Sequence, residues 1–210
     1  MGRAIRSPTM RLLLLHGWGA TGDDLAPLGH ELAHRLSRRG AAVTVRSLEA
    51  PESHPAGGGA RQWYPLDLGQ PGWPDCPDAA RLDLRRRLES ELAQAEGEPV
   101  VVLGFSQGGA MALEAGLSLP VNAILSCSGY PHARGLRLPA ADTPAPSVLL
   151  VHGRLDPVVP AVALDQLQQS LRSAGVPVET ALFACDHTIP PEALDAIASF
   201  LDRFTAAAGS

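Results

Sequence analysis

The stretch that most constrains the fold of this chain is residues 104–108, where a serine lies between two glycines in the pattern Gly-x-Ser-x-Gly. An apolar run, residues 100–103, precedes it, and a stretch compatible with a helix, residues 110–117, follows it. In this context of strand, turn and helix, the pattern is typical of a nucleophile elbow, a sharp turn that exposes a serine hydroxyl. Backbone crowds backbone in such a turn, so small neighbours are needed, and glycine supplies that space on both sides of Ser106.

Apolar segments of strand length alternate along the chain with segments of helical periodicity. Strands are expected at residues 11–15, 42–48, 100–103, 121–127, 147–152 and 178–183. Helices are expected at residues 23–39, 78–96 and 110–117, and around the apolar repeats of residues 164–174 and 194–204. This alternation predicts an α/β fold with a mostly parallel central sheet and helices on both faces. Such sheets bind ligands at the carboxyl ends of their strands, where the glycine-rich turns of this chain are also expected.

A length of 210 residues fits one domain with a substantial core. We expect a loose leader at residues 1–10 and a single domain over residues 11–206, without a large separate cap domain. The longest irregular stretch, residues 51–77, is rich in proline and glycine and is expected to be a functional or mobile loop. Its Trp63 and Tyr64 are candidates for an apolar substrate wall, and anchoring of the loop to the domain is an equally good interpretation.

The composition excludes several classes of protein. A formal net charge of −5 argues against a nucleic-acid-binding protein, because no basic stripe is available to neutralise phosphates. A membrane-spanning helix is not expected either, since no apolar run approaches the roughly 18 residues that it requires. Three widely spaced cysteines, Cys76, Cys127 and Cys185, form neither a disulfide framework nor a Cys-x-x-Cys site, so a reducing, cytoplasmic compartment is expected. No His-x-His or His-Glu-x-x-His pattern appears, and we expect neither a metal nor another cofactor.

A serine is a poor nucleophile at neutral pH, so Ser106 needs a base within hydrogen-bond reach and a third group that orients this base. His187 lies between the last expected strand and the last expected helix, where a loop can bring its imidazole to the serine. Asp156, in the turn after the strand that ends at His152, is the candidate carboxylate. The competing acids are Asp142, Asp165 and Asp186.

Acyl transfer also needs N–H donors for the charge that develops on the substrate's carbonyl oxygen. The residue after the nucleophile provides one, so the backbone N–H of Gln107 is the first candidate. The glycine-rich turn after the first strand is expected at the same edge of the sheet, which makes the backbone N–H of Trp18 the second. His16, in that turn, is expected to be a packing residue rather than a base.

Four ordered segments, residues 15–22, 104–109, 152–160 and 186–192, resemble the carboxylesterase, acyl-protein thioesterase and lysophospholipase family of the α/β-hydrolases. The resemblance implies an α/β-hydrolase fold and a serine hydrolase that cleaves carboxylic esters or thioesters. It also implies particular site residues, namely a triad of Ser106, Asp156 and His187 and an oxyanion hole at Trp18 and Gln107.

The chain also departs from the pattern of this family. Residues 61–64 are similar to the family's Arg-x-Trp-Tyr/Phe stretch near the acyl pocket. Family members commonly carry leucine where Trp18 stands and glycine where Asp186 stands, and the first change could narrow the acyl entrance. The preferred acyl chain length is therefore open.

The resemblance implies a small-molecule or lipid-like acyl ester as the substrate and a monomer or homodimer as the assembly. One alternative is the same machinery acting on amides, lactones, peptides or acylated proteins. Another is a non-catalytic binder of a small apolar ligand, and the presence of all three triad residues counts against it. A metal hydrolase is the remaining alternative.

Overall fold

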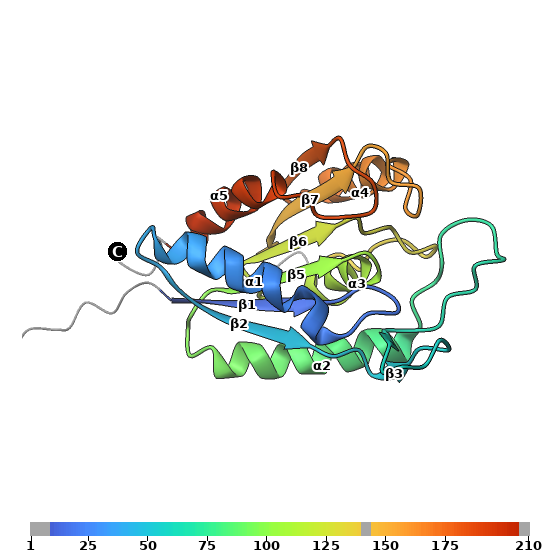
Figure 1. Cartoon of the computed structure of the whole chain (residues 1–210), viewed down its shortest axis with the longest axis horizontal. Helices are drawn as coiled ribbons and strands as arrows, with labels where there is room; N and C mark the ends of the chain where they lie inside the picture. The colour runs from blue at the N-terminus through green and yellow to red at the C-terminus, as the bar shows by residue number, and fades with distance from the viewer. Residues whose placement is uncertain (1–8, 140–143, 206–210) are drawn as a thin grey trace, which may run out of the picture.

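The computed structural model describes residues 9–139 and 144–205, and these form a six-stranded sheet with helices on both faces and a short two-stranded sheet (Figure 1). The strands of the six-stranded sheet are β1 (Thr9–Leu15), β2 (Ala42–Leu48), β5 (Val100–Phe105), β6 (Ala123–Cys127), β7 (Ser147–Gly153) and β8 (Val178–Phe183). The helices are α1 (Gly22–Ser37), α2 (Asp78–Gln94), α3 (Gln107–Gly116), α4 (Val162–Ser173) and α5 (Ala193–Thr205). The strand order is β2-β1-β5-β6-β7-β8, and every neighbouring pair is parallel. The predicted α/β fold is thus confirmed.

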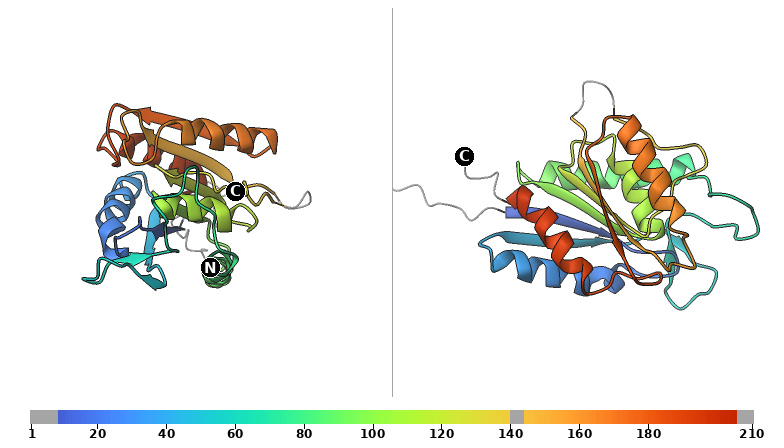
Figure 2. Two further views of the ribbon diagram at one scale, coloured as in Figure 1. Left: turned by 90° about the vertical axis from the view of Figure 1, so that its right-hand side faces the viewer. Right: turned by 90° about the horizontal axis from the view of Figure 1, so that it is seen from above.

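The sheet is covered on both faces because successive residues of a strand point to opposite sides. In β1, Leu13 and Leu15 belong to the core under α2, α3 and α4, whereas Leu12 and Leu14 belong to the core under α1 and α5. Figure 2 shows the same two layers of helices. The central strands β5, β6 and β7 are buried almost throughout, which explains why the sequence shows them as unbroken apolar runs.

The first strand begins at Thr9, two residues before the predicted start. Thr9 pairs with Ala42 of β2, and the fully buried Met10 packs into the core under α1 and α5. These two residues therefore belong to β1, whereas the sequence analysis placed residues 1–10 in a loose leader. Residues 1–8 of that leader, residue 206 and Asp142 lie outside the described residues.

The loop of residues 51–77 contains no long regular element, as its prolines and glycines predict. It holds one short antiparallel pair, β3 (Glu52–Ser53) and β4 (Arg61–Gln62). None of the helices in the described part of the chain is both long and apolar enough to cross a membrane.

The chain reverses its direction of travel across the sheet between β1 and β5, which are neighbours in space. After β1 the chain enters α1 on one face, and after β5 it enters α3 on the opposite face. The two connections diverge, which leaves room at the carboxyl ends of these strands for a ligand. Residues 16–21 and Ser106 lie in these two connections.

Candidate active site

Ser106 occupies a sharp turn between β5 and α3. Its backbone has φ 53° and ψ −118°, a region that residues with a side chain rarely adopt, and its N–H donates to the carbonyl of Cys127 at 2.8 Å. A Cβ atom on Gly104 would lie 2.1 Å from the carbonyl oxygen of Gly108. A Cβ atom on Gly108 would lie 2.1 Å from the carbonyl oxygen of Leu15. Backbone contact on both sides therefore requires the two glycines, as the pattern predicts.

The structure brings the side chains of Ser106, His187 and Asp156 together. The distance from His187 Nε2 to Ser106 Oγ is 3.0 Å, and that from His187 Nδ1 to Asp156 Oδ2 is 2.7 Å. His187 lies in the loop between β8 and α5, where Phe105 packs against its ring at 4.8 Å between centroids. Asp156 lies in the turn after β7. The loops that follow β5, β7 and β8 at the carboxyl edge of the sheet thus supply three side chains that are hydrogen-bonded in series.

The carboxyl group of Asp156 is buried and fully hydrogen-bonded. Its Oδ1 accepts the backbone N–H groups of Val158 at 2.9 Å and Val159 at 2.8 Å, while its Oδ2 faces His187. Burial alone would raise the pKa of Asp156, but the hydrogen bonds from His187, Val159 and Val158 outweigh it and lower the pKa. The ionised carboxylate accepts a hydrogen bond from the Nδ1–H group of the imidazole, so Nε2 carries no proton and can accept one from the serine.

The two competing acids that the structure describes, Asp165 and Asp186, do not form this contact. Asp165 lies on α4 and is exposed, and Asp186 is exposed although it adjoins His187. His152, which the sequence analysis used only to end a strand, has its Nε2 at 3.6 Å from Asp156 Oδ2 and at 2.8 Å from the carbonyl of Val159. It therefore packs behind the carboxylate.

Gly153, the last residue of β7, allows the loop that carries His187 to approach closely. A Cβ atom there would lie 2.3 Å from the carbonyl oxygen of Asp186 and 2.5 Å from that of Cys185. Leu155 N–H also donates to Cys185 O at 3.0 Å. This approach sets the imidazole beside Asp156, and sequence reasoning missed it. The available signal was a glycine directly after a buried strand.

The two candidate oxyanion donors flank the serine. An added Cβ atom on Gly17 would lie 3.5 Å from the Cβ atom of Ser106, so the turn of residues 16–20 packs against the elbow. Within residues 9–139 and 144–205, no acceptor bonds to the backbone N–H of Trp18 or to that of Gln107. Both N–H groups are therefore without an acceptor among the residues that the structure describes.

His16 is a buried packing residue, as expected. Its Nδ1 lies 2.8 Å from the carbonyl oxygen of Gly17, and its Nε2 accepts the N–H of Ala50 at 3.0 Å. Burial is the main reason that the pKa of His16 is lowered, although the hydrogen bond to Gly17 and the nearby Glu49 act in the opposite direction. The neutral ring thereby fixes the peptide unit whose other end is the Trp18 N–H.

Trp63 and Tyr64, the candidates for an apolar substrate wall, are buried in the structure. Their exposed fractions are 1% and 0%, so neither ring presents a surface to a ligand in this structure. The indole N–H of Trp63 donates to His16 O at 2.8 Å, and the Tyr64 hydroxyl lies 2.8 Å from both the Tyr130 hydroxyl and His132 Nε2. These contacts match the alternative interpretation, in which the rings anchor the loop.

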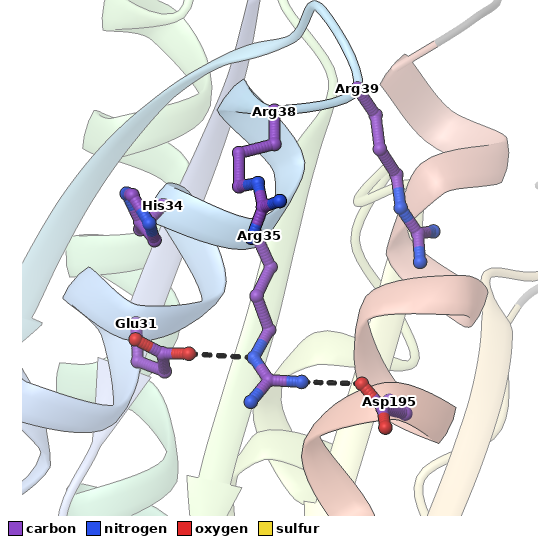
Figure 3. A pocket seen from close by; sticks show the side chains of 6 residues that line it. All are labelled: Glu31, His34, Arg35, Arg38, Arg39 and Asp195. Atoms are coloured by element: carbon purple, nitrogen blue, oxygen red, sulfur yellow. Dashed lines mark hydrogen bonds and ion pairs between the residues drawn. The ribbon is translucent and has the colours of Figure 1, made fainter.

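A hollow lies between α1 and α5, and none of the three residues Ser106, Asp156 and His187 lines it (Figure 3). It is lined by Glu31, His34, Arg35, Arg38, Arg39 and Asp195. Arg35 reaches Glu31 at 2.7 Å on its own helix and also Asp195 on α5, so several of these charges compensate one another. Within the described residues, no group of three or more His, Cys, Asp and Glu side chains is placed to hold a metal ion.

Comparisons with known proteins give matches over nearly the whole chain. The family described as phospholipase/carboxylesterase matches residues 3–205. Acyl-protein thioesterase 1 of Saccharomyces cerevisiae is 25% identical over 221 aligned positions, which cover 95% of this chain and 94% of the relative. The crystal structure of esterase PE8 is 30% identical, with a TM-score of 0.73 over 93% of this chain and 92% of its own. Acyl-protein thioesterase 2 of Zea mays, at 21% identity, shares the fold, with a TM-score of 0.70 over 98% of this chain and 97% of its own.

Proposed function

The chain belongs to the phospholipase/carboxylesterase family of α/β-hydrolases, and we propose that it cleaves carboxylic esters or thioesters through an acyl-serine intermediate. The observation that carries this proposal is the hydrogen-bonded chain from Ser106 Oγ through His187 to Asp156, at 3.0 and 2.7 Å. Such a chain is the arrangement that activates a serine as a nucleophile.

In the first half of the proposed reaction, Ser106 Oγ attacks the carbonyl carbon while its proton passes to His187 Nε2. The carbonyl oxygen becomes an oxyanion, which accepts hydrogen bonds from the backbone N–H groups of Trp18 and Gln107. Asp156 stabilises the positive imidazole and keeps its orientation. The tetrahedral intermediate then expels the alkoxide or thiolate, which takes the proton from His187 and leaves as an alcohol or thiol.

In the second half, a water molecule attacks the acyl-serine and gives one proton to His187 Nε2. The same N–H groups stabilise the second oxyanion. Collapse of this intermediate breaks the bond to Ser106 Oγ, which takes the proton back from His187, and the carboxylic acid is released.

The direct test compares Ser106→Ala with Ser170→Ala, a change on the exposed side of α4. Turnover of p-nitrophenyl butyrate and labelling by a fluorophosphonate should vanish in Ser106→Ala and persist in Ser170→Ala. A Ser106→Ala protein that keeps wild-type turnover would show that another group performs the chemistry. A wild-type protein that neither turns over the ester nor reacts with the probe would favour the non-catalytic binder.

The type of bond that is cleaved, and hence the leaving group, is tested next. A panel of p-nitrophenyl esters, acyl thioesters, anilides and lactones with acyl chains of two to twelve carbons separates an esterase or thioesterase from the alternatives. The named relatives include both an esterase and acyl-protein thioesterases, so both leaving groups belong on the panel.

We also propose a cytoplasmic location and a monomeric or homodimeric assembly. Cys76, Cys127 and Cys185 are free thiols in the structure, which suits a reducing compartment. Fractionation of the native cells and the elution volume of the purified protein test these two statements.

A further inference from the structure

A single short segment, Arg61–Tyr64, contacts both turns that carry the candidate oxyanion donors. Towards the turn of residues 16–20 it forms two main-chain hydrogen bonds, from Gly19 N to Arg61 O at 2.8 Å and from Arg61 N to Ala20 O at 2.9 Å. Side chains add the bond from Trp18 Nε1 to Gln62 Oε1 at 2.9 Å and that from Trp63 Nε1 to His16 O at 2.8 Å. The Trp18 donor is therefore flanked on both sides by contacts to this segment.

The other donor residue is tied to the same segment by its side chain. Gln107 Oε1 accepts the N–H of Trp63 at 2.9 Å, and Gln107 Nε2 donates to the carbonyl of Tyr64 at 2.8 Å. The side chain is completely buried, so these bonds have no competition from water. A carboxamide offers one acceptor and one donor on the same plane, which is what a main-chain N–H and C=O require.

The segment is in turn fixed to the rest of the domain. The Arg61 guanidinium donates to the carbonyl of Ala50 at 2.9 Å and to that of Pro51 at 2.6 Å. At the other end, the Tyr64 hydroxyl is held by Tyr130 and His132. Arg61–Tyr64 is thus a braced part of an otherwise irregular loop.

We propose that Arg61–Tyr64 is a positioning element of the oxyanion hole, and that the Gln107 carboxamide and the Trp63 indole N–H are positioning groups that set the distance between the Trp18 and Gln107 donors. This inference rests on the proposed function. The donors themselves are main-chain groups, so substitution cannot delete them, but loss of their common support displaces them. Removal of one oxyanion donor costs about 10²–10³-fold in rate, and a displacement of about 1 Å costs about 10²-fold.

The test uses two variants, each of which releases the segment at one place. Gln107→Met keeps the size of the side chain but removes both hydrogen bonds, and Trp63→Phe keeps an aromatic ring but removes the bond to His16. Gln168→Met is the matched control, because Gln168 lies on α4 and its side chain donates a long hydrogen bond of 3.4 Å to the hydroxyl of Thr180 on β8. The steady-state constants for p-nitrophenyl butyrate are measured together with the inhibition constant of n-butylboronic acid, which adds to a reactive serine as a tetrahedral mimic of the intermediate.

We expect kcat to fall by about 10- to 100-fold in both variants, with KM within about threefold of the wild type. The inhibition constant of the boronic acid should rise in proportion to the fall in kcat/KM, because the mimic and the transition state use the same donors. The double variant should lose less than the product of the two single losses, since both changes release one segment. Gln168→Met should match the wild type.

A purely structural role gives a different result. Gln107→Met and Trp63→Phe would then lower the melting temperature while the folded proteins kept the wild-type kcat and boronic acid inhibition, and this outcome would overturn the inference. Multiplicative losses in the double variant would also overturn it. Failure of the proposed function is recognised separately, because Ser106→Ala would then be as active as the wild type.

Discussion

The main chain approaches the loop that carries His187 closely at Gly153, and Gly153→Ala probes this contact with a single methyl group. The added Cβ atom would lie 2.3 Å from the carbonyl oxygen of Asp186, whereas ordinary contact begins at 3.4 Å. The obstructing atoms are main chain, so no side chain can rotate away. The loop that carries His187 must therefore retreat by the difference, about 1.1 Å, since the opposing strand β7 is central and buried on both faces.

This retreat acts directly on the reacting atoms. His187 follows Asp186 in the chain, and its Nε2 now lies 3.0 Å from Ser106 Oγ. A shift of about 1 Å takes this pair beyond hydrogen-bond distance, and misplacement on this scale lowers the rate by about 10²-fold, or about 2.7 kcal/mol of transition-state stabilisation. Overpacking of this size costs about 1–3 kcal/mol of folding stability, so the variant should still fold.

The assay is kcat/KM for p-nitrophenyl butyrate, with a thermal melt of the same preparation. Gly69→Ala is the control, because the nearest atom to its added Cβ is a side-chain oxygen of Asp67 at 3.3 Å, and it should keep wild-type activity. If folded Gly153→Ala turned over the ester within threefold of the wild-type rate, the loop would be able to yield without moving the imidazole, and the reasoning from this contact would fail.

Other predictions concern the acid, the buried histidine and the elbow. Asp156→Asn should lower kcat by about 10⁴-fold, because an amide favours the wrong imidazole tautomer; a loss below tenfold would contradict the assigned role. The pKa of Asp156 is lowered in the folded protein, so its ionised carboxylate contributes to the free energy of unfolding. This contribution should be constant above about pH 4 and disappear at lower pH. The difference in the free energy of unfolding between the wild type and Asp156→Asn, measured against pH, tests this. Burial lowers the pKa of His16, so the free energy of unfolding should decrease as the pH falls below about 6.5, with a weaker pH dependence in His16→Gln. Gly108→Ala should lower the melting temperature more than Gly69→Ala, because its Cβ would meet Leu15 O at 2.1 Å.

The order of strands and helices could be predicted because burial leaves a direct mark on the sequence. The strands β5, β6 and β7 are buried on both faces and read as nearly continuous apolar runs. The helices α1, α4 and α5 each bury one side, which shows in the sequence as an apolar stripe, whereas α3 is buried throughout. The proximity of the Ser106, Asp156 and His187 side chains could be predicted for a related reason. The carboxyl ends of parallel strands meet at one edge, so residues just after β5, β7 and β8 are brought together.

The contacts that hold the loop of residues 61–64 against the elbow leave no comparable pattern in the sequence. Gln107 binds main-chain groups 43 and 44 residues away, and neither its spacing nor its neighbours in the sequence identify those partners. The aromatic residues of the loop were ambiguous, since an irregular path has no periodicity from which to tell a buried ring from an exposed one. The predicted start of β1 was two residues too late. The strand begins where its pairing with β2 begins, and local hydropathy does not show that position.

The unusual backbone conformation of Ser106 lowers the stability of the fold, whereas the proposed activity requires a serine in this conformation. A residue with a side chain in that conformation costs about 1–3 kcal/mol, and the cost is met during folding by the neighbouring strands, before any ester arrives. Glycine at the same place would relax the turn and leave a sturdier protein without a nucleophile. We therefore expect Ser106→Gly to raise the free energy of unfolding and to abolish the proposed activity. Reactivity and stability make opposite demands on this one position.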